Sequence, residues 1–206
     1  MKSILLSIKP KYCELIANGK KTIEVRKTKP KLEPPFKCYI YCTKSNDGLI
    51  KGDISTTIDY IAKNSGKVIG EFVCDEIYKY SAEFVESPKD TYEEIRQIWL
   101  DNEGDECDAI IATNERDDPN SCEICRKSCL SFDELREYIG VNFHDYPFYG
   151  WHIFDLKIYD TPKELGEFYK ISTNCHRGIQ KNDCDYCFDC QITRSPQSWC
   201  YVEEEV

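Results

Sequence analysis

Three charged residues near the N-terminus have the types and spacing of a binding or catalytic site. Lys21, Glu24 and Arg26 belong to the run 18–27, which reads as a turn that leads into a strand. Because side chains alternate along a strand, Glu24 and Arg26 would share one face, and the apolar residues beside them would point to the other. Lys21, at the strand entrance, can reach over the polar face on its long side chain.

The chemistry of this group depends on where the strand lies. On a solvated surface it is an ion pair, which adds only about 0–1 kcal/mol of stability. In a cleft, the two cations suit phosphate groups and the carboxylate can accept a hydrogen bond from an exocyclic amine. The flanking elements therefore decide the interpretation.

The segment before the charged strand predicts a compact strand–helix–turn unit. Ser3–Ile8 is apolar or small throughout and reads as a buried strand. Pro10 opens a helix, in which it is tolerated at the first position, and Gly19 is placed to end it. The short apolar run that starts the chain is too brief for a secretory signal or a membrane span, since Lys9 and Pro10 follow it. We therefore expect a cytoplasmic protein without a membrane contact.

The rest of the chain predicts strands with a few helices. Strand patterns cover 36–42, 66–74, where Gly70 allows a bulge or a close backbone approach, 149–159 and 198–202. Helical patterns cover 56–62, 92–100, a short turn within 162–169, and the segment that follows Ser131, where Ser131 and Glu134 have the form of a capping box. We expect one domain, 1–206, with an acidic insertion at about 81–130 and a cysteine-rich element at about 175–200.

Charge is distributed unevenly along the 206 residues. The formal net charge is −10, which argues against a protein that coats nucleic acid through bulk electrostatics. From Lys9 to Lys37, however, nine Lys or Arg face three Glu, a local charge of +6, so the remainder carries −16. A basic patch on an acidic body predicts a local anionic partner. The sequence contains no P-loop, no dinucleotide-binding fingerprint and no Ser/His/Asp arrangement, and it predicts no organic cofactor.

Thirteen cysteines in a chain expected to be cytoplasmic predict metal binding before disulfides. The tail offers Cys175, Cys184, Cys187 and Cys190, whose spacing suits a tetrahedral structural zinc, with His176 as a substitute for the first. An alternative set joins Cys122 and Cys125 to Cys184 and Cys187. The same cysteines also fit surface thiols or an iron–sulfur cluster.

Several of these stretches together resemble a known family. The order Ser7–Pro10, then Gly19-x-Lys21-x-x-Glu24-x-Arg26, then Gly66–Phe72 is similar to the ASCH domain of the PUA-like superfamily. The segments 149–153 and 195–201 are similar to bacterial and phage members. The resemblance covers about 2–76 and 149–203, with insertions between.

The resemblance implies an α+β fold built on a small PUA-like β-barrel with peripheral helices and insertions. It also implies a module that binds RNA, a nucleoside or a modified nucleotide. The ligand-binding residues would be the signature residues Lys21, Glu24 and Arg26, with Lys9 nearby and with Trp151, Trp199 and Tyr149 as stacking residues. A Trp or Tyr in a strand also fits ordinary core packing.

The same resemblance leaves open whether the protein is an enzyme. One branch of the superfamily removes the acetyl group from N4-acetylcytidine and shares Gly19, Lys21, Thr22 and Arg26, but it carries a threonine where this chain has Glu24. The alternative function is therefore a hydrolase acting on a nucleobase amide or on RNA. In that case Lys21, with its pKa lowered by burial beside Arg26, would be the base and Glu24 would position a water.

Overall fold

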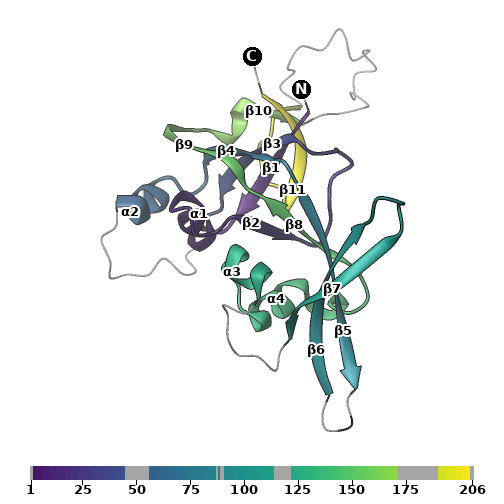
Figure 1. Cartoon of the computed structure of the whole chain (residues 1–206). Coiled ribbons are helices and arrows are strands. Elements are labelled where there is room, and N and C mark those ends of the chain that lie inside the picture. The colour runs from purple at the N-terminus through teal and green to yellow at the C-terminus, as the bar shows by residue number, and fades with distance from the viewer. Residues whose placement is uncertain are drawn as a thin grey trace. The chain divides into compact units, whose positions relative to one another are not determined.

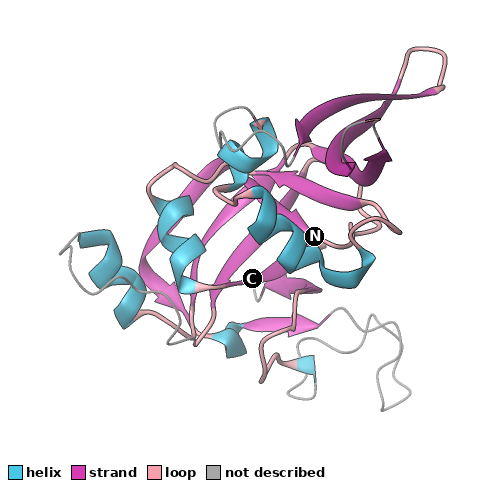
Figure 2. Cartoon of the chain, turned by 90° about the horizontal axis from the view of Figure 1, so that it is seen from below, coloured by secondary structure: helices cyan, strands magenta, loops and turns pink. Residues whose placement is uncertain are grey.

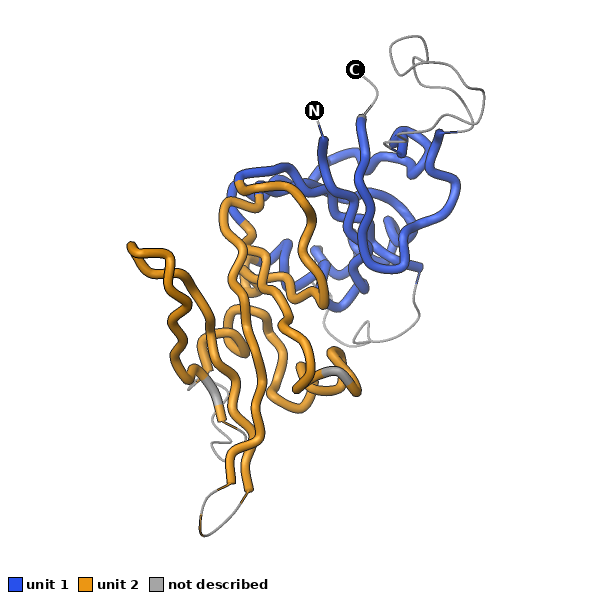
Figure 3. The backbone as a smooth tube through the Cα atoms, turned by 90° about the vertical axis from the view of Figure 1, so that its right-hand side faces the viewer, with its two compact units in different colours: residues 1–18, 35–73, 154–206 blue, residues 19–34, 74–153 orange. Residues whose placement is uncertain are grey.

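Two sheets and a few short helices make up the described part of the molecule. The computed structural model describes residues 2–44, 56–86, 88, 91–113, 122–170 and 190–204. Its strands form one sheet of six strands and one of five (Figures 1 and 2). Contacts divide the chain into unit 1, residues 1–18, 35–73 and 154–206, and unit 2, residues 19–34 and 74–153 (Figure 3). The expected α+β class is confirmed, but the described strands run in two open orders and do not close into the expected barrel.

The six-stranded sheet belongs to unit 1 and has the order β10-β11-β1-β3-β4-β9. Its strands are β1 (Ser3–Ile8), β3 (Phe36–Cys42), β4 (Val68–Cys74), β9 (Phe154–Lys163), β10 (Phe168–Lys170) and β11 (Trp199–Glu204). β1 is buried at all six positions because it pairs on both sides, in parallel with β3 and antiparallel with β11. The uncharged strand expected at the start of the chain is therefore the centre of this sheet.

The helices of unit 1 begin and end close to where the sequence placed them. α1 (Pro10–Ala17) has Pro10 at its first position, and Gly19 follows it with φ +69°, a left-handed conformation that favours glycine. α2 (Thr56–Lys63) confirms the helix expected at 56–62, and the short 3-10 helix η2 (Leu165–Glu167) confirms the turn within 162–169. Both helical patterns depend on residues close together in sequence, so they can be predicted without knowledge of the tertiary contacts.

Gly70 lies at an irregularity between β4 and β9, as expected. The register shifts between Val68 and Gly70, and a Cβ added at Gly70 would lie 2.5 Å from the carbonyl oxygen of Lys157. Only glycine leaves room for this close approach. Beside the bulge, unit 1 buries an apolar cluster made of Leu5, Tyr39, Tyr41, Val68, Phe168, Ile192 and Val202.

The five-stranded sheet belongs to unit 2 and has the order β2-β8-β5-β6-β7. Its strands are β2 (Ile23–Arg26), β5 (Ile77–Glu86), β6 (Thr91–Leu100), β7 (Glu106–Thr113) and β8 (Phe148–His152). All neighbouring pairs are antiparallel. β2, which carries the charged signature, is thus held along one side by β8.

The helix expected at 92–100 is wrong, because this segment is strand β6. Its glutamates, arginine and glutamine favour a helix locally. In the structure, however, β6 pairs along eight residue positions with β5 and along seven with β7. These non-local hydrogen bonds override the local helix propensity, and the sequence pattern of the segment alone does not reveal them.

The single strand expected at 149–159 is also wrong, since the chain changes sheets there. β8 ends at His152 in the sheet of unit 2, and β9 starts at Phe154 in the sheet of unit 1. The N–H of Ile153, between them, donates to the carbonyl of Thr22 at 2.9 Å, and Asp155 has φ +46°. The continuous apolar pattern conceals this break because both strands have buried or half-buried positions.

Two short helices and one 3-10 turn complete unit 2: α3 (Glu123–Ser128), α4 (Phe132–Ile139) and η1 (Gly140–Asn142). The expected capping box is present: the side chain of Ser131 accepts from the N–H of Glu134, whose carboxylate accepts from the N–H of Ser131. In the part of the chain that the structure describes, no helix is long and apolar enough to span a membrane.

Candidate functional site

The signature residues Lys21, Glu24 and Arg26 form one buried ionic network in unit 2. Glu24 lies between the two cations, with Oε2 3.3 Å from Nζ of Lys21 and Oε1 3.0 Å from Nη2 of Arg26. Their exposed fractions are 3% for Lys21, 7% for Glu24 and 5% for Arg26. They are therefore not the exposed ion pair of a solvated strand, and breaking such a buried network costs several kcal/mol.

Helix α3 closes the network from one side. The ammonium of Lys21 donates to the carbonyl oxygen of Ser128 at 2.7 Å, and the N–H of Thr22 donates to the carbonyl of Lys127 at 2.8 Å. These carbonyls lie at the C-terminal end of α3, where helical carbonyls lack a partner within the helix and a cation is favoured. The carbonyls at the end of α3 and the donors at the entrance of β2 therefore satisfy each other's hydrogen-bonding needs.

The network leaves one positive charge in the interior. Two cations share a single carboxylate, so the group carries a formal +1. Burial lowers the pKa of Lys21, and the Glu24 carboxylate works against this shift. An anion that approaches the network is attracted by the uncompensated charge, because charges interact more strongly in a low-dielectric interior than in water.

Tyr138, on α4, joins the buried network to the surface. Its hydroxyl accepts a hydrogen bond from Arg26, and burial raises the pKa of Tyr138 although 39% of the residue is exposed. The ammonium of Lys27 lies 5.8 Å from the centroid of the same ring. The ring of Tyr138 thus stands between a buried guanidinium and an exposed ammonium.

A basic cavity with aromatic walls opens directly after the signature strand. It has a volume of about 450 Å³ and lies between the segment that follows β2 and the one that precedes β8. Lys27 and Lys29 supply its cations, and Tyr146 and Tyr149 supply aromatic rings. Both lysines are exposed, and Tyr146 is 65% exposed. We refer to it below as the basic cavity.

Comparison with protein families identifies this architecture. The ASCH domain model matches residues 6–116, which is more than half of the chain and includes the strand with the ionic network. The chain belongs to the ASCH domain family.

One solved structure agrees with this assignment at the level of the fold. The ASCH protein from Zymomonas mobilis is 15% identical, with 98% of this chain and 89% of that chain covered and a TM-score of 0.50. A tyrosine-to-phenylalanine variant of that protein is also 15% identical, with 100% and 93% covered and a TM-score of 0.48. A comparison with curated proteins gave no match.

The signature residues Lys21, Glu24 and Arg26 lie together, as the sequence predicted. The other residues expected to contact a ligand lie on other elements of the fold. Trp151 is fully buried on β8, where its backbone pairs with Glu24 of β2. Lys9 is exposed at the start of α1, and Trp199 is half-buried on β11 beside Tyr201; both belong to unit 1. Ligand contact by these three residues stays a prediction, whereas Tyr149 does line the basic cavity.

The metal prediction for this ASCH chain falls partly outside the described residues. Cys175, Cys184 and Cys187 lie there, as does His176, while Cys190 is half-buried at the edge of the described segment. No group of three or more His, Cys, Asp and Glu side chains with the arrangement of a metal site occurs among the residues that the structure describes. Neither zinc arrangement is complete within that part, so zinc stays a prediction.

Cys122 and Cys125 lie close together at the start of α3. The Sγ of Cys122 accepts from the N–H of Cys125 at 3.2 Å, and both side chains are buried. A hydrogen bond from Cys125 lowers the pKa of the Cys122 thiol and raises that of Cys125 itself. Two neighbouring thiols of this kind fit half of a tetrahedral zinc site, as the alternative arrangement requires.

Sequence reasoning missed three parts of the candidate site. Ser128 contributes its backbone carbonyl, which every residue has, so its identity in the sequence gave no indication of this contact. Tyr138 lies within the helix predicted after Ser131, but its distance in sequence from Arg26 gave no reason to join them. Lys27 and Lys29 were visible only as part of the basic segment, and the cavity they line is created by residues more than a hundred positions later.

Proposed function

We propose that this ASCH protein binds single-stranded RNA or a modified nucleotide at the basic cavity. The observation that carries the proposal is the combination of Lys27 and Lys29 with the rings of Tyr146 and Tyr149 in one cavity beside the buried, positively charged network. Lysines contact phosphates, and aromatic side chains stack on unpaired bases. The formal net charge of −10 favours a local contact with nucleic acid over a long electrostatic track.

The division of roles follows from burial. Lys27 and Lys29 are exposed and can contact a phosphate directly, while Lys21, Glu24 and Arg26 are buried and hold Tyr138 and the end of β2 in place. The signature would then act on the ligand through its net charge and through the position of the cavity wall. This is why substitution of the exposed lysines is the cleaner test.

Fluorescence anisotropy with a short, labelled single-stranded RNA tests the proposal. We expect the double change Lys27→Ala and Lys29→Ala to weaken binding and to reduce the slope of log affinity against log salt by about 0.7 for each lost phosphate contact. The matched control is Lys157→Ala with Lys170→Ala, because these lysines are also exposed but lie on β9 and β10. Equal effects of both double variants would contradict the proposal.

A second candidate function is a hydrolase that acts on a nucleobase amide or on RNA. Burial lowers the pKa of Lys21 and so favours this function, since a general base needs a pKa nearer to neutrality. The Glu24 carboxylate, 3.3 Å away, opposes this shift, and in this function it would position a water. Incubation of the pure protein with N4-acetylcytidine and with short RNAs, followed by product analysis, tests this function. Product that forms with the wild type but not with Lys21→Met would support it, and no product at high protein concentration would exclude these substrates.

A further inference from the structure

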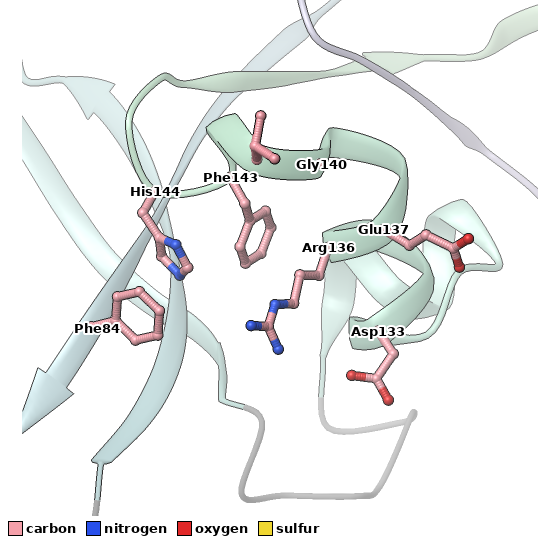
Figure 4. A pocket seen from close by; sticks show the side chains of 8 residues that line it. Phe84, Asp133, Arg136, Glu137, Gly140, Phe143 and His144 are labelled. Carbon is pink, nitrogen blue, oxygen red and sulfur yellow. The ribbon is translucent and has the colours of Figure 1, made fainter.

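Unit 2 contains a second cavity, which the signature does not reach. Its volume is about 570 Å³, and it is formed by β5, α4 and the segment after α4. Figure 4 shows the rings of Phe84 and His144 on one side and the guanidinium of Arg136 directed toward them. Asp133 lies on the Arg136 side, and Glu137 points away.

The aromatic side of this cavity is a preformed flat surface. The rings of Phe84 and His144 are stacked, with centroids 3.8 Å apart and an angle of 26° between their planes, and Phe143 meets His144 edge-on at 5.1 Å. Phe84 nevertheless remains 58% exposed. A rigid, exposed aromatic ring is suited to stack on a planar ligand, since little conformational freedom is lost on binding.

A buried carboxylate holds this surface in position. Glu93 is directly opposite Phe84 in the pairing of β5 with β6, and it is 3% exposed. Its Oε1 lies 2.9 Å from Nε2 of His144, and its Oε2 lies 3.3 Å from Nη1 of Arg136. Glu93 therefore lies within ion-pair distance of both the imidazole under the stack and the guanidinium beside it.

The polar groups that remain select a ligand class. Arg136 is balanced by Glu93 but is half-exposed and keeps further N–H donors for a ligand. Asp133 is exposed, and its carboxylate provides acceptors. Asp133 disfavours a phosphate in this cavity, and Arg136 disfavours a basic side chain. A neutral planar ring with both donors and acceptors at its edge satisfies both groups.

We propose that this cavity binds a nucleobase, stacked on Phe84 and hydrogen-bonded at its edge by Arg136 and Asp133. It adjoins the basic cavity, because Ile139 lines the basic cavity and Gly140, the next residue, lines this one. Nζ of Lys27 lies 4.0 Å from the position that a Cβ on Gly140 would take. The base belongs to the nucleotide next to the one at the basic cavity, so the inference rests on the proposed function.

The edge chemistry favours guanine among the bases. Arginine donates to the O6 and N7 acceptors of guanine, and a carboxylate accepts from its N–H groups. Uracil has two carbonyl oxygens and only one N–H at its edge. It therefore offers the Asp133 carboxylate fewer hydrogen-bond donors than guanine does. The site therefore prefers a diguanylate over a diuridylate.

The test measures binding of the 5′-phosphorylated dinucleotides pGpG and pUpU by isothermal titration calorimetry. We expect Phe84→Ala to weaken pGpG binding about 5-fold to 150-fold, the range found when a stacking ring is removed. Phe84→Trp keeps the stacking surface and should retain binding. Asp133→Asn should reduce the preference for pGpG over pUpU.

Phe154→Ala is the matched control, because Phe154 is similarly exposed, at 54%, but lies on β9 in unit 1. If Phe84→Ala and Phe154→Ala bind pGpG as the wild type does, while Lys27→Ala with Lys29→Ala weakens it, the second base site is wrong and the proposed function stands. If the wild type binds neither dinucleotide nor RNA, both fail.

Discussion

The ammonium of Lys21 donates to the carbonyl of Ser128 across 107 residues of sequence, at 2.7 Å. This bond fixes the entrance of the signature strand to the end of α3. Together with the Glu24 carboxylate, 3.3 Å away, it explains how a lysine that is 3% exposed is held in the interior, since both acceptors lie against its ammonium.

Removal of the central carboxylate should destabilise the fold. Glu24→Gln leaves Lys21 and Arg26 buried without a counter-charge, so we expect the free energy of unfolding to fall by about 3–5 kcal/mol. Urea unfolding followed by circular dichroism measures this change. Glu33→Gln, an exposed change in the same unit, is the control. A loss below about 1 kcal/mol for Glu24→Gln would contradict the buried network.

Acid stability should depend on Glu71 in unit 1. Burial raises the pKa of Glu71, but the hydroxyl of Tyr159 at 2.5 Å and the ammonium of Lys37 at 3.3 Å outweigh it, so the pKa lies below its ordinary 4.5. Because the folded-state pKa is the lower one, Glu71 stabilises the fold above about pH 4.5, and this contribution is lost as the pH falls through the folded-state value.

The corresponding measurement compares Glu71→Gln with the wild type at pH 7 and at pH 3. We expect the variant to be less stable at pH 7 and the difference to shrink as the pH is lowered to 3. Glu164→Gln, whose pair with Lys67 is exposed, should change little at either pH. A difference for Glu71→Gln that persists unchanged at pH 3 would show that its contacts do not depend on the charge.

Trp151 should behave as a core residue. It is fully buried on β8, so Trp151→Ala should reduce the free energy of unfolding by about 3–5 kcal/mol. Trp99→Ala is the control on the same sheet. Because Trp99 is 44% exposed, this substitution should reduce the free energy of unfolding much less. Weaker nucleotide binding by Trp151→Phe without loss of stability would instead favour the ligand-stacking role.

Zinc content can separate the two cysteine arrangements. We expect about one zinc per chain by elemental analysis, as for one tetrahedral site. Cys190→Ser should remove the metal only if the tail supplies all four ligands, and Cys122→Ser only if the alternative set does. Serine is itself a good N-cap, so Cys122→Ser should leave the start of α3 intact. Folded wild-type protein without metal would contradict both arrangements.

The accuracy of the sequence interpretation varied with how local each feature was. Pro10 and Gly19 marked the ends of α1, and the pair Ser131 and Glu134 marked the start of α4, because capping depends on residues a few positions apart. The segment 92–100 was misassigned since its strand pairing comes from β5 and β7. The break at Ile153 was missed because the two strands that flank it have similar patterns but join different sheets.

By itself, the sequence determined the family signature, the alternation that puts Glu24 and Arg26 on one face, and the basic character of the segment around them. The tertiary structure alone decided that this face is buried, that Ser128 and Tyr138 complete it, and that two cavities flank the end of α4. The physical reason is that a strand's periodicity specifies which side chains share a face, whereas the contacts of that face come from segments about a hundred residues away.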